Sequence, residues 1–170
     1  MRLFRSFSAN SAGVRLEGSR TFLRPPGERD WRAYAEIRAA NRKFLEPWEP
    51  TWPSDALSRD AFYRRLNRYA SDWRNDTGYS MFVFERESYA LLGGISLSNV
   101  RRGVAQCGTL GYWIGEDYAG QGYMREGLAL LLGFCFDELG LHRVEAACLP
   151  SNAASRGLLV GSGFSEDCYA

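Results

Sequence analysis

The sequence predicts a mixed α/β domain, and two observations support this fold class. First, an apolar strand pattern at 106–114 leads through a turn with Gly120 and Gly122 directly into a long helical pattern. Second, strand and helix patterns follow one another along the chain without a repeat or a linker. With 170 residues, 45% of them hydrophobic, the whole chain (1–170) is expected to form a single domain with a sizeable core.

The first half of the chain predicts one strand and two helices. Thr21–Arg24 has a short strand pattern that ends before two prolines. Asp30 is a plausible N-cap for a helix that carries Trp31, Tyr34, Ile37 and Arg38. Three prolines at 44–53 forbid a continuous helix there, and Ser58 then opens a second helix with Phe62, Leu66 and Tyr69 on one face.

The second half predicts most of the sheet. Residues 79–84 and 89–97 are expected to form two antiparallel strands, and 106–114 a third. The apolar helix from about Gln121 ends at Gly140, and 143–149 form the next strand. Asn152 is suited to cap a last helix that ends before Gly163.

The glycine turn has the character of an anion site. Gly120 and Gly122 lack the Cβ atoms that would keep a ligand from the backbone, and the first amides of the following helix have no intrahelical acceptor. A phosphate-binding P-loop would have Lys-Ser/Thr where Tyr123 and Met124 stand, and a dinucleotide motif would have glycine in place of Arg125. The turn therefore predicts a pyrophosphate held by backbone amides without a metal.

These residues resemble the GNAT N-acetyltransferases, whose acetyl-CoA loop reads Arg/Gln-x-x-Gly-x-Gly/Ala. Here Asp117 stands at the first position of that loop. The resemblance is closer to the RimJ/RimL branch of ribosomal-protein N-terminal acetyltransferases and covers roughly 21–170. It rests on ordered motifs: Gly111-Tyr-x-Ile-Gly115, Gly120-x-Gly-x-Met-x-Glu-x-Leu128, Leu141-His-Arg-Val144, Pro150-x-Asn152-x-x-Ser155 and Gly163-Phe164.

The resemblance implies a twisted, mostly antiparallel sheet with helices on both faces and a central pair of parallel strands that splay apart. It also implies an acetyl-CoA-dependent transfer of an acetyl group to a primary amine, such as the N-terminal α-amine of a ribosomal protein. The pantetheine arm would pair with strand backbone in the splay. The implied cofactor-binding residues are Gly111, Tyr112, Trp113, Ile114, Gly120, Gln121, Gly122, Tyr123, Met124, Arg125, Asn152 and Ser155.

Tyr112 and Trp113 point to opposite faces of their strand, so only one of them can approach the cofactor, and the sequence leaves open which. Asn152 can contact the pantetheine arm, cap its helix, or do both.

The catalytic candidates are one hydroxyl and two carboxylates. Ser155 is expected to donate a hydrogen bond to the departing thiolate, because Leu159 stands where many members of the superfamily have a tyrosine acid. Glu46 and Glu49 lie in the aromatic, proline-rich loop that faces the acceptor in this family. They are candidates for the general base, acting through water, and the alternative is that both are solvated loop carboxylates.

The sequence alone leaves three other functions to consider. The same scaffold acetylates small-molecule amines. A non-catalytic acyl-CoA-binding module would keep the glycine turn and need no acceptor. A nicotinamide-dependent dehydrogenase would have an acid at the end of a strand about twenty residues after the loop. The nearest such acid, Glu145, lies within its strand.

Composition excludes several partners. A net charge of +1 gives no sign of nucleic-acid binding, and no apolar run reaches the length of a membrane span. The four cysteines have no metal-binding spacing, so we expect no metal, a reducing and therefore cytoplasmic location, and core positions for Cys135 and Cys148.

The two ends of the chain raise separate questions. Residues 1–20 are rich in Arg and Ser, which fits either an organellar transit peptide or, as we favour, a short basic lead-in to the first strand. Family members usually continue past position 170 with two more strand segments. The sequence is therefore either a fragment, or the protein completes its sheet with a partner chain, for example in a homodimer.

Overall fold

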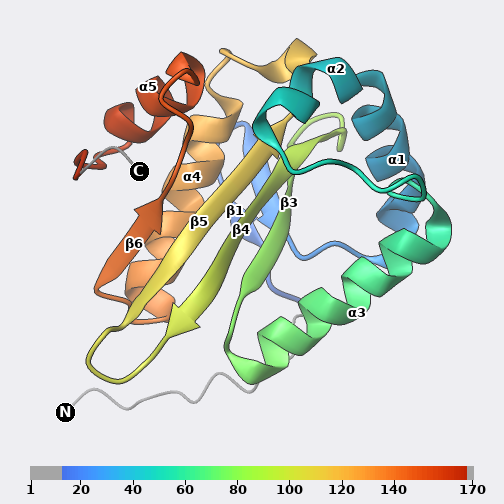
Figure 1. Cartoon of the computed structure of the whole chain (residues 1–170). Helices are drawn as coiled ribbons and strands as arrows, with labels where there is room; N and C mark the ends of the chain where they lie inside the picture. Colours follow the sequence, from blue (N-terminus) through green and yellow to red (C-terminus); the bar gives the residue numbers. More distant parts are fainter. Residues whose placement is uncertain (1–12, 168–170) are drawn as a thin grey trace.

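The computed structural model describes residues 13–167. Most of the expected basic lead-in and Cys168 lie outside this range. The described chain forms one six-stranded sheet in the order β1-β2-β3-β4-β5-β6, with helices on both faces (Figure 1). The strands are β1 (Leu16–Glu17), β2 (Thr21–Arg24), β3 (Tyr79–Glu85), β4 (Leu91–Arg101), β5 (Cys107–Ile114) and β6 (Arg143–Ala146).

Five α-helices accompany the sheet, and none within residues 13–167 combines the length and apolar character needed to cross a membrane. They are α1 (Trp31–Ala40), α2 (Arg42–Leu45), α3 (Arg59–Asn75), α4 (Tyr123–Gly133) and α5 (Ala153–Gly161). Short 3₁₀ turns lie at Glu28–Asp30, Glu46–Trp48 and Glu116–Tyr118, and a wider π-helical turn, Phe134–Glu138, extends α4.

The sheet has the predicted mixture of directions. Each neighbouring pair from β1 to β5 is antiparallel, and β5 pairs with β6 in parallel. A parallel pair needs a crossover connection, which α4 supplies. The mixed α/β fold class and the parallel pair implied by the resemblance are confirmed, and within residues 13–167 this pair lies at one end of the sheet.

Alternating residues of the inner strands build a core on each face of the sheet. On the α4 face, Leu23 and Val83 pack in one cluster with Leu128. On the opposite face, Phe22 and Phe82 pack in a second cluster with Tyr34 of α1 and Phe62 of α3. Because successive strand residues point to opposite faces, β2 and β3 can contribute to both cores.

Two of the three residues predicted to begin helices cap them through their side chains. The Ser58 hydroxyl accepts a hydrogen bond from the Ala61 amide at 3.1 Å, and Asn152 Oδ1 accepts one from the Ser155 amide at 3.0 Å. Asp30 precedes α1 as predicted but its side chain does not cap that helix. Its carboxylate instead accepts two hydrogen bonds from Arg24, both at 2.7 Å, because the preceding 3₁₀ turn directs it back toward β2.

The cysteine prediction is half correct. Cys135 is fully buried, and burial raises the pKa of its thiol to about 12, so the thiol stays neutral. Cys148 is exposed, contrary to the prediction, because β6 ends at Ala146 and the chain leaves the sheet before reaching it. The predicted strand at 143–149 is therefore three residues too long.

Candidate functional site

Strand β5 loses one of its neighbours halfway along its length. Its parallel pairing with β6 runs from Cys107 and Arg143 to Leu110 and Ala146 and ends there within the described chain. Pairing with β4 continues to Ile114. The backbone groups of residues 111–114 that face β6 therefore have no strand partner, and an extended ligand can hydrogen-bond to them.

The glycine turn follows β5 and leads into α4. Gly120 and Gly122 adopt φ angles of +72° and +86°, in the left-handed region where glycine is favoured. A Cβ atom on Gly120 would meet no atom within 4 Å, so the turn faces open space. The first backbone bond of the helix runs from the Glu126 amide to the Gly122 carbonyl at 3.1 Å. The amides before Glu126 have no helical acceptor and can bind an anion.

Contacts from Ser19 and Arg20, between β1 and β2, fix the position of this turn. Arg20 donates a hydrogen bond to the Gln121 carbonyl at 2.9 Å and lies over the Tyr123 ring at 4.1 Å. Glu126 accepts hydrogen bonds from the Ser19 hydroxyl at 2.9 Å and the Arg20 amide at 3.0 Å. Partial burial opposes the ionisation of Glu126, but these hydrogen bonds outweigh it and lower the pKa of the carboxyl.

The predicted cofactor residues of the turn differ in what they can offer a ligand. Tyr123 and Met124 are buried, and the Tyr123 hydroxyl donates to Glu85 at 2.7 Å, so both residues have only backbone amides for a phosphate. Gln121 and Arg125 are exposed. The Arg125 guanidinium lies against Gly161 of α5, at the rim of the turn.

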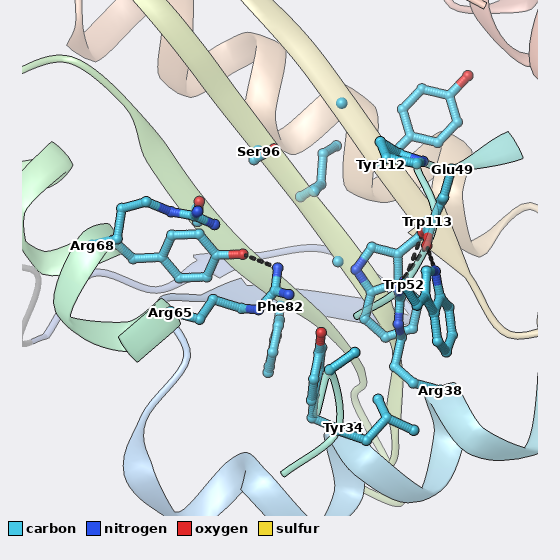
Figure 2. Close-up of a pocket in the computed structure, with 18 of the residues that line it drawn as sticks. Tyr34, Arg38, Glu49, Trp52, Arg65, Arg68, Phe82, Ser96, Tyr112 and Trp113 are labelled. Atoms are coloured by element: carbon cyan, nitrogen blue, oxygen red, sulfur yellow. Dashed lines mark hydrogen bonds and ion pairs between the residues drawn. The ribbon is translucent and has the colours of Figure 1, made fainter. Parts of the chain in front are cut away.

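The structure resolves which way Tyr112 and Trp113 point. Tyr112 is directed toward α5, and its hydroxyl lies 2.5 Å from the Ser155 hydroxyl. Trp113 lies on the opposite face, where its ring is 6.0 Å from that of Tyr34. In Figure 2 the Tyr112 ring points away from the cavity that Trp113 lines. Burial raises the pKa of Tyr112 and the hydrogen bond to Ser155 offsets part of this rise, so the phenol keeps its proton.

An open cavity of about 530 Å³ lies on the Trp113 face of the sheet (Figure 2). Its walls come from α1, the loop at 49–53, α3 and strands β3, β4 and β5. Gly111, Tyr112 and Trp113 line it, so the segment of β5 that has lost its β6 partner borders this cavity. The two features together form a continuous candidate active site.

The two predicted carboxylates have different environments. Glu49 lines the cavity and accepts hydrogen bonds from Arg38 at 2.7 and 2.6 Å and from the Trp52 indole at 2.8 Å. The Arg38 guanidinium also lies 4.2 Å from the Trp52 ring. Glu46 does not line the cavity and forms an exposed ion pair with Arg42, one helical turn earlier. The structure thus brings only Glu49 to the site, and there it anchors the loop.

The cavity also contains residues that the sequence patterns did not identify as candidates for the site. Arg65, Arg68 and Tyr69 line it from α3, and Ser96 lines it from β4. Arg65 and Arg68 are three residues apart and therefore share a helix face, a spacing that is visible in the sequence. Because α3 carries many other arginines, this spacing does not by itself indicate which of them meet a cavity.

We expect Glu49→Gln to destabilise the fold much more than Glu46→Gln does. Glu49→Gln leaves the Arg38 guanidinium, whose side chain is 10% exposed, without its carboxylate, and we expect a loss of about 2–4 kcal/mol. Glu46→Gln removes an exposed ion pair and should cost less than about 0.5 kcal/mol. Urea unfolding of both variants measures the difference, and equal midpoints would contradict the anchoring role of Glu49.

Comparisons with known proteins agree on the family. Residues 20–165 match the acetyltransferase (GNAT) domain. The [ribosomal protein uS5]-alanine N-acetyltransferase of Escherichia coli K12 is 30% identical over 164 residues, which cover 96% of this chain and 84% of that protein. The probable N-acetyltransferase YjcK of Bacillus subtilis is 28% identical over 155 residues, 91% of this chain and 86% of that protein.

Solved structures agree with the sequence matches. Mycobacterium smegmatis RimJ in complex with CoA-disulfide superposes with a TM-score of 0.86 at 27% identity, covering 93% of this chain and 78% of that one. The ribosomal-protein-S5-alanine acetyltransferase of Vibrio fischeri superposes with a TM-score of 0.84 at 26% identity, covering 91% and 84%. The chain therefore belongs to the GNAT acetyltransferase family, with ribosomal-protein N-acetyltransferases among its relatives, and is an acyltransferase.

Proposed function

We propose that this acyltransferase moves an acetyl group from acetyl-CoA to the N-terminal α-amine of a protein, of the kind carried by ribosomal proteins. The observation that supports this most is that strand β5 borders both a ligand-accessible backbone edge and an open cavity. Two substrates can then meet at one short segment, Gly111–Trp113. The ribosomal-protein acetyltransferases among the relatives support the choice of a protein α-amine as the acceptor.

The described residues fit acetyl-CoA. The open glycine turn and the free first-turn amides of α4, from Gln121 to Arg125, suit its pyrophosphate. The edge of β5 at Gly111–Ile114 suits an extended pantetheine arm. Asn152 caps α5, whose Ser155 contacts Tyr112 of this segment. Acetyl-CoA supplies the acetyl group as a thioester. The three free cysteines of the described chain fit a reducing compartment, so the proposal includes a cytoplasmic location.

Ser155 and Tyr112 are proposed to act on the leaving-group side. Either hydroxyl can donate across their 2.5 Å contact. If Tyr112 donates to Ser155, the serine proton is free to form a hydrogen bond with the departing sulfur. Burial raises the pKa of Tyr112, so the phenol stays protonated at neutral pH and has a proton to donate. A backbone amide of 111–113 is proposed to stabilise charge on the thioester oxygen.

The acceptor side is proposed to need little base catalysis. A protein α-amine has a pKa of about 7.7–8.0, so a useful fraction is neutral at physiological pH. The cavity lowers that pKa further, because three arginines and one glutamate line it. Glu49 can still accept a proton through a water molecule, although Arg38 and Trp52 already occupy its oxygens. Glu46 is proposed only to add a negative charge near the rim of the cavity, and not to act as a base.

The direct test is to measure free-CoA release with a panel of acceptors. We expect N-terminal peptides to drive acetyl-CoA-dependent release with a higher kcat/KM than small-molecule amines. Mass spectrometry should place the acetyl group on the α-amine. A preference for small amines would favour the alternative of a small-molecule acetyltransferase. Acetyl-CoA binding without release by any amine would contradict the transferase proposal.

Gly120→Glu tests the proposed pyrophosphate site. We expect it to weaken acetyl-CoA binding at least tenfold, about 1.4 kcal/mol, because a carboxylate would occupy the place of a phosphate. Gly103→Glu is a matched control, because Gly103 lies in the exposed β4–β5 turn with φ +69°, and a Cβ atom there would also meet no atom within 4 Å. Calorimetry measures both affinities, and equal binding by the two variants would rule out this site.

Ser155→Ala tests the leaving-group role. We expect kcat to fall by about 100-fold, the lower end of the effect of a positioned proton donor, while acetyl-CoA affinity stays within about twofold. Tyr112→Phe leaves Ser155 without its phenolic partner and should lower kcat by a smaller factor. Steady-state kinetics with a saturating peptide give both values. Unchanged kcat in Ser155→Ala would remove Ser155 from the mechanism.

A further inference from the structure

Two arginines of α3 project into the acceptor cavity from the side opposite Glu49 (Figure 2). Arg65 is half-buried and Arg68 is exposed at the rim. Arg65 contacts the Tyr69 hydroxyl at 3.4 Å, a weak hydrogen bond, and its Cζ atom is 5.6 Å from the Tyr34 ring. The Cζ atom of Arg68 is 5.6 Å from the Tyr69 ring. Their contacts are therefore with aromatic side chains.

Neither arginine is neutralised within the described chain. Neither is part of an ion pair with a carboxylate in residues 13–167, whereas Arg64, their neighbour on α3, pairs with Asp55 outside the cavity. The single acidic residue that lines the cavity, Glu49, is held by Arg38. The buried Nε atom of Arg65 also lacks a hydrogen-bond partner among these residues. The α3 side of the cavity thus carries two positive charges that form no ion pair within residues 13–167, and Glu49 attracts Arg65 only at longer range.

The positive charge of Arg65 and Arg68 affects which acceptors can bind. An amine that enters as an ammonium ion would be repelled by these arginines unless it also carried a negative group. Guanidinium groups match carboxylates in geometry and bind them through charge-assisted hydrogen bonds. A carboxylate on the acceptor would offset the repulsion and orient the amine toward β5.

The distances indicate where this carboxylate lies in a peptide. The Tyr34 ring is 5.6 Å from Arg65 Cζ and 6.0 Å from the ring of Trp113. Arg65 Cζ therefore lies within about 12 Å of the Trp113 ring on β5. An extended peptide advances about 3.3–3.6 Å per residue. With the amine beside Gly111–Trp113, a side chain at the second or third position of the peptide spans this separation.

We infer that Arg65 and Arg68 form a carboxylate-binding subsite that selects acceptors with Asp or Glu at the second or third position. The inference rests on the proposed transfer to a peptide α-amine. It assigns Arg65 and Arg68 to substrate selection, and it distinguishes this acceptor cavity from one that takes cationic amines.

The test compares peptides that differ only by an acid and its amide. Ala-Glu and Ala-Ala-Glu peptides are paired with the corresponding Gln peptides. With the wild type we expect kcat/KM for the acidic peptides to be at least about tenfold higher, the size expected from hydrogen bonds to a charged group. In Arg65→Gln and Arg68→Gln this ratio should fall to within about twofold. Arg74→Gln is the matched control, because Arg74 is an exposed residue of the same helix outside the cavity.

A binding measurement distinguishes a failure of the carboxylate subsite from a failure of the proposed acetyl transfer. Calorimetry of each unacetylated peptide with the protein saturated with CoA reports the subsite without turnover. Tighter binding of acidic peptides that depends on Arg65 and Arg68, without acetylation, would support the subsite and refute the transferase proposal. Acetylation of acidic and neutral peptides at equal rates would refute the subsite and leave the proposed function intact. Failure of both peptides to bind would also refute the subsite.

Two further measurements use the single Arg68→Gln variant and free amino acids as acceptors. Arg68→Gln alters an exposed side chain, so its result stands even if Arg65→Gln unfolds the protein. Free glutamate and aspartate offer the same carboxylate as small molecules. If they are acetylated as efficiently as the acidic peptides, the carboxylate does not need the spacing of two or three residues, and the assignment of the subsite to peptide acceptors is refuted.

Discussion

The end of pairing between β5 and β6 is the constraint on which the candidate site depends. Up to Leu110 the strand β5 has a neighbour on each side, and beyond it only β4 remains. Backbone polar groups need partners, so the unpaired edge is suited to an extended ligand. The glycine turn follows the end of β5 after a few residues, and Arg20 and Ser19 fix it against the N-terminal strands. The two parts of the proposed acetyl-CoA site are thereby held in one frame.

The alternation of side chains along β5 divides the chemistry between two faces of the sheet. Tyr112 points to α5 and Ser155, where the leaving group is proposed to lie, while Trp113 points to the cavity proposed for the acceptor. The close approach of Trp113 to β4 requires the absence of a side chain at Gly94, since a Cβ there would lie 2.5 Å from the indole nitrogen. One short strand segment can therefore serve both substrates.

Charge in the cavity proposed for the acceptor is unevenly distributed. Arg38, Glu49 and Trp52 form a compact cluster that anchors the proline-rich loop, so the glutamate contributes little free negative charge. Arg65 and Arg68 contribute positive charge on the other side. Such a field favours the neutral form of an incoming amine. Under the proposed function, this field would reduce the need for a dedicated base.

Features that depend only on residues close together in the sequence could be predicted from the sequence. Strand alternation, the Ser58 and Asn152 caps and the glycine turn are local patterns, and the structure contains all of them. Only the packing of the elements showed which residues come together across long separations. Tyr112 contacts Ser155, 43 positions away, and the arginines of α3 line the same cavity as β5. Packing also directed Asp30 to Arg24 and exposed Cys148. Local pattern specifies backbone conformation, whereas the partner of a polar side chain depends on how the elements come together.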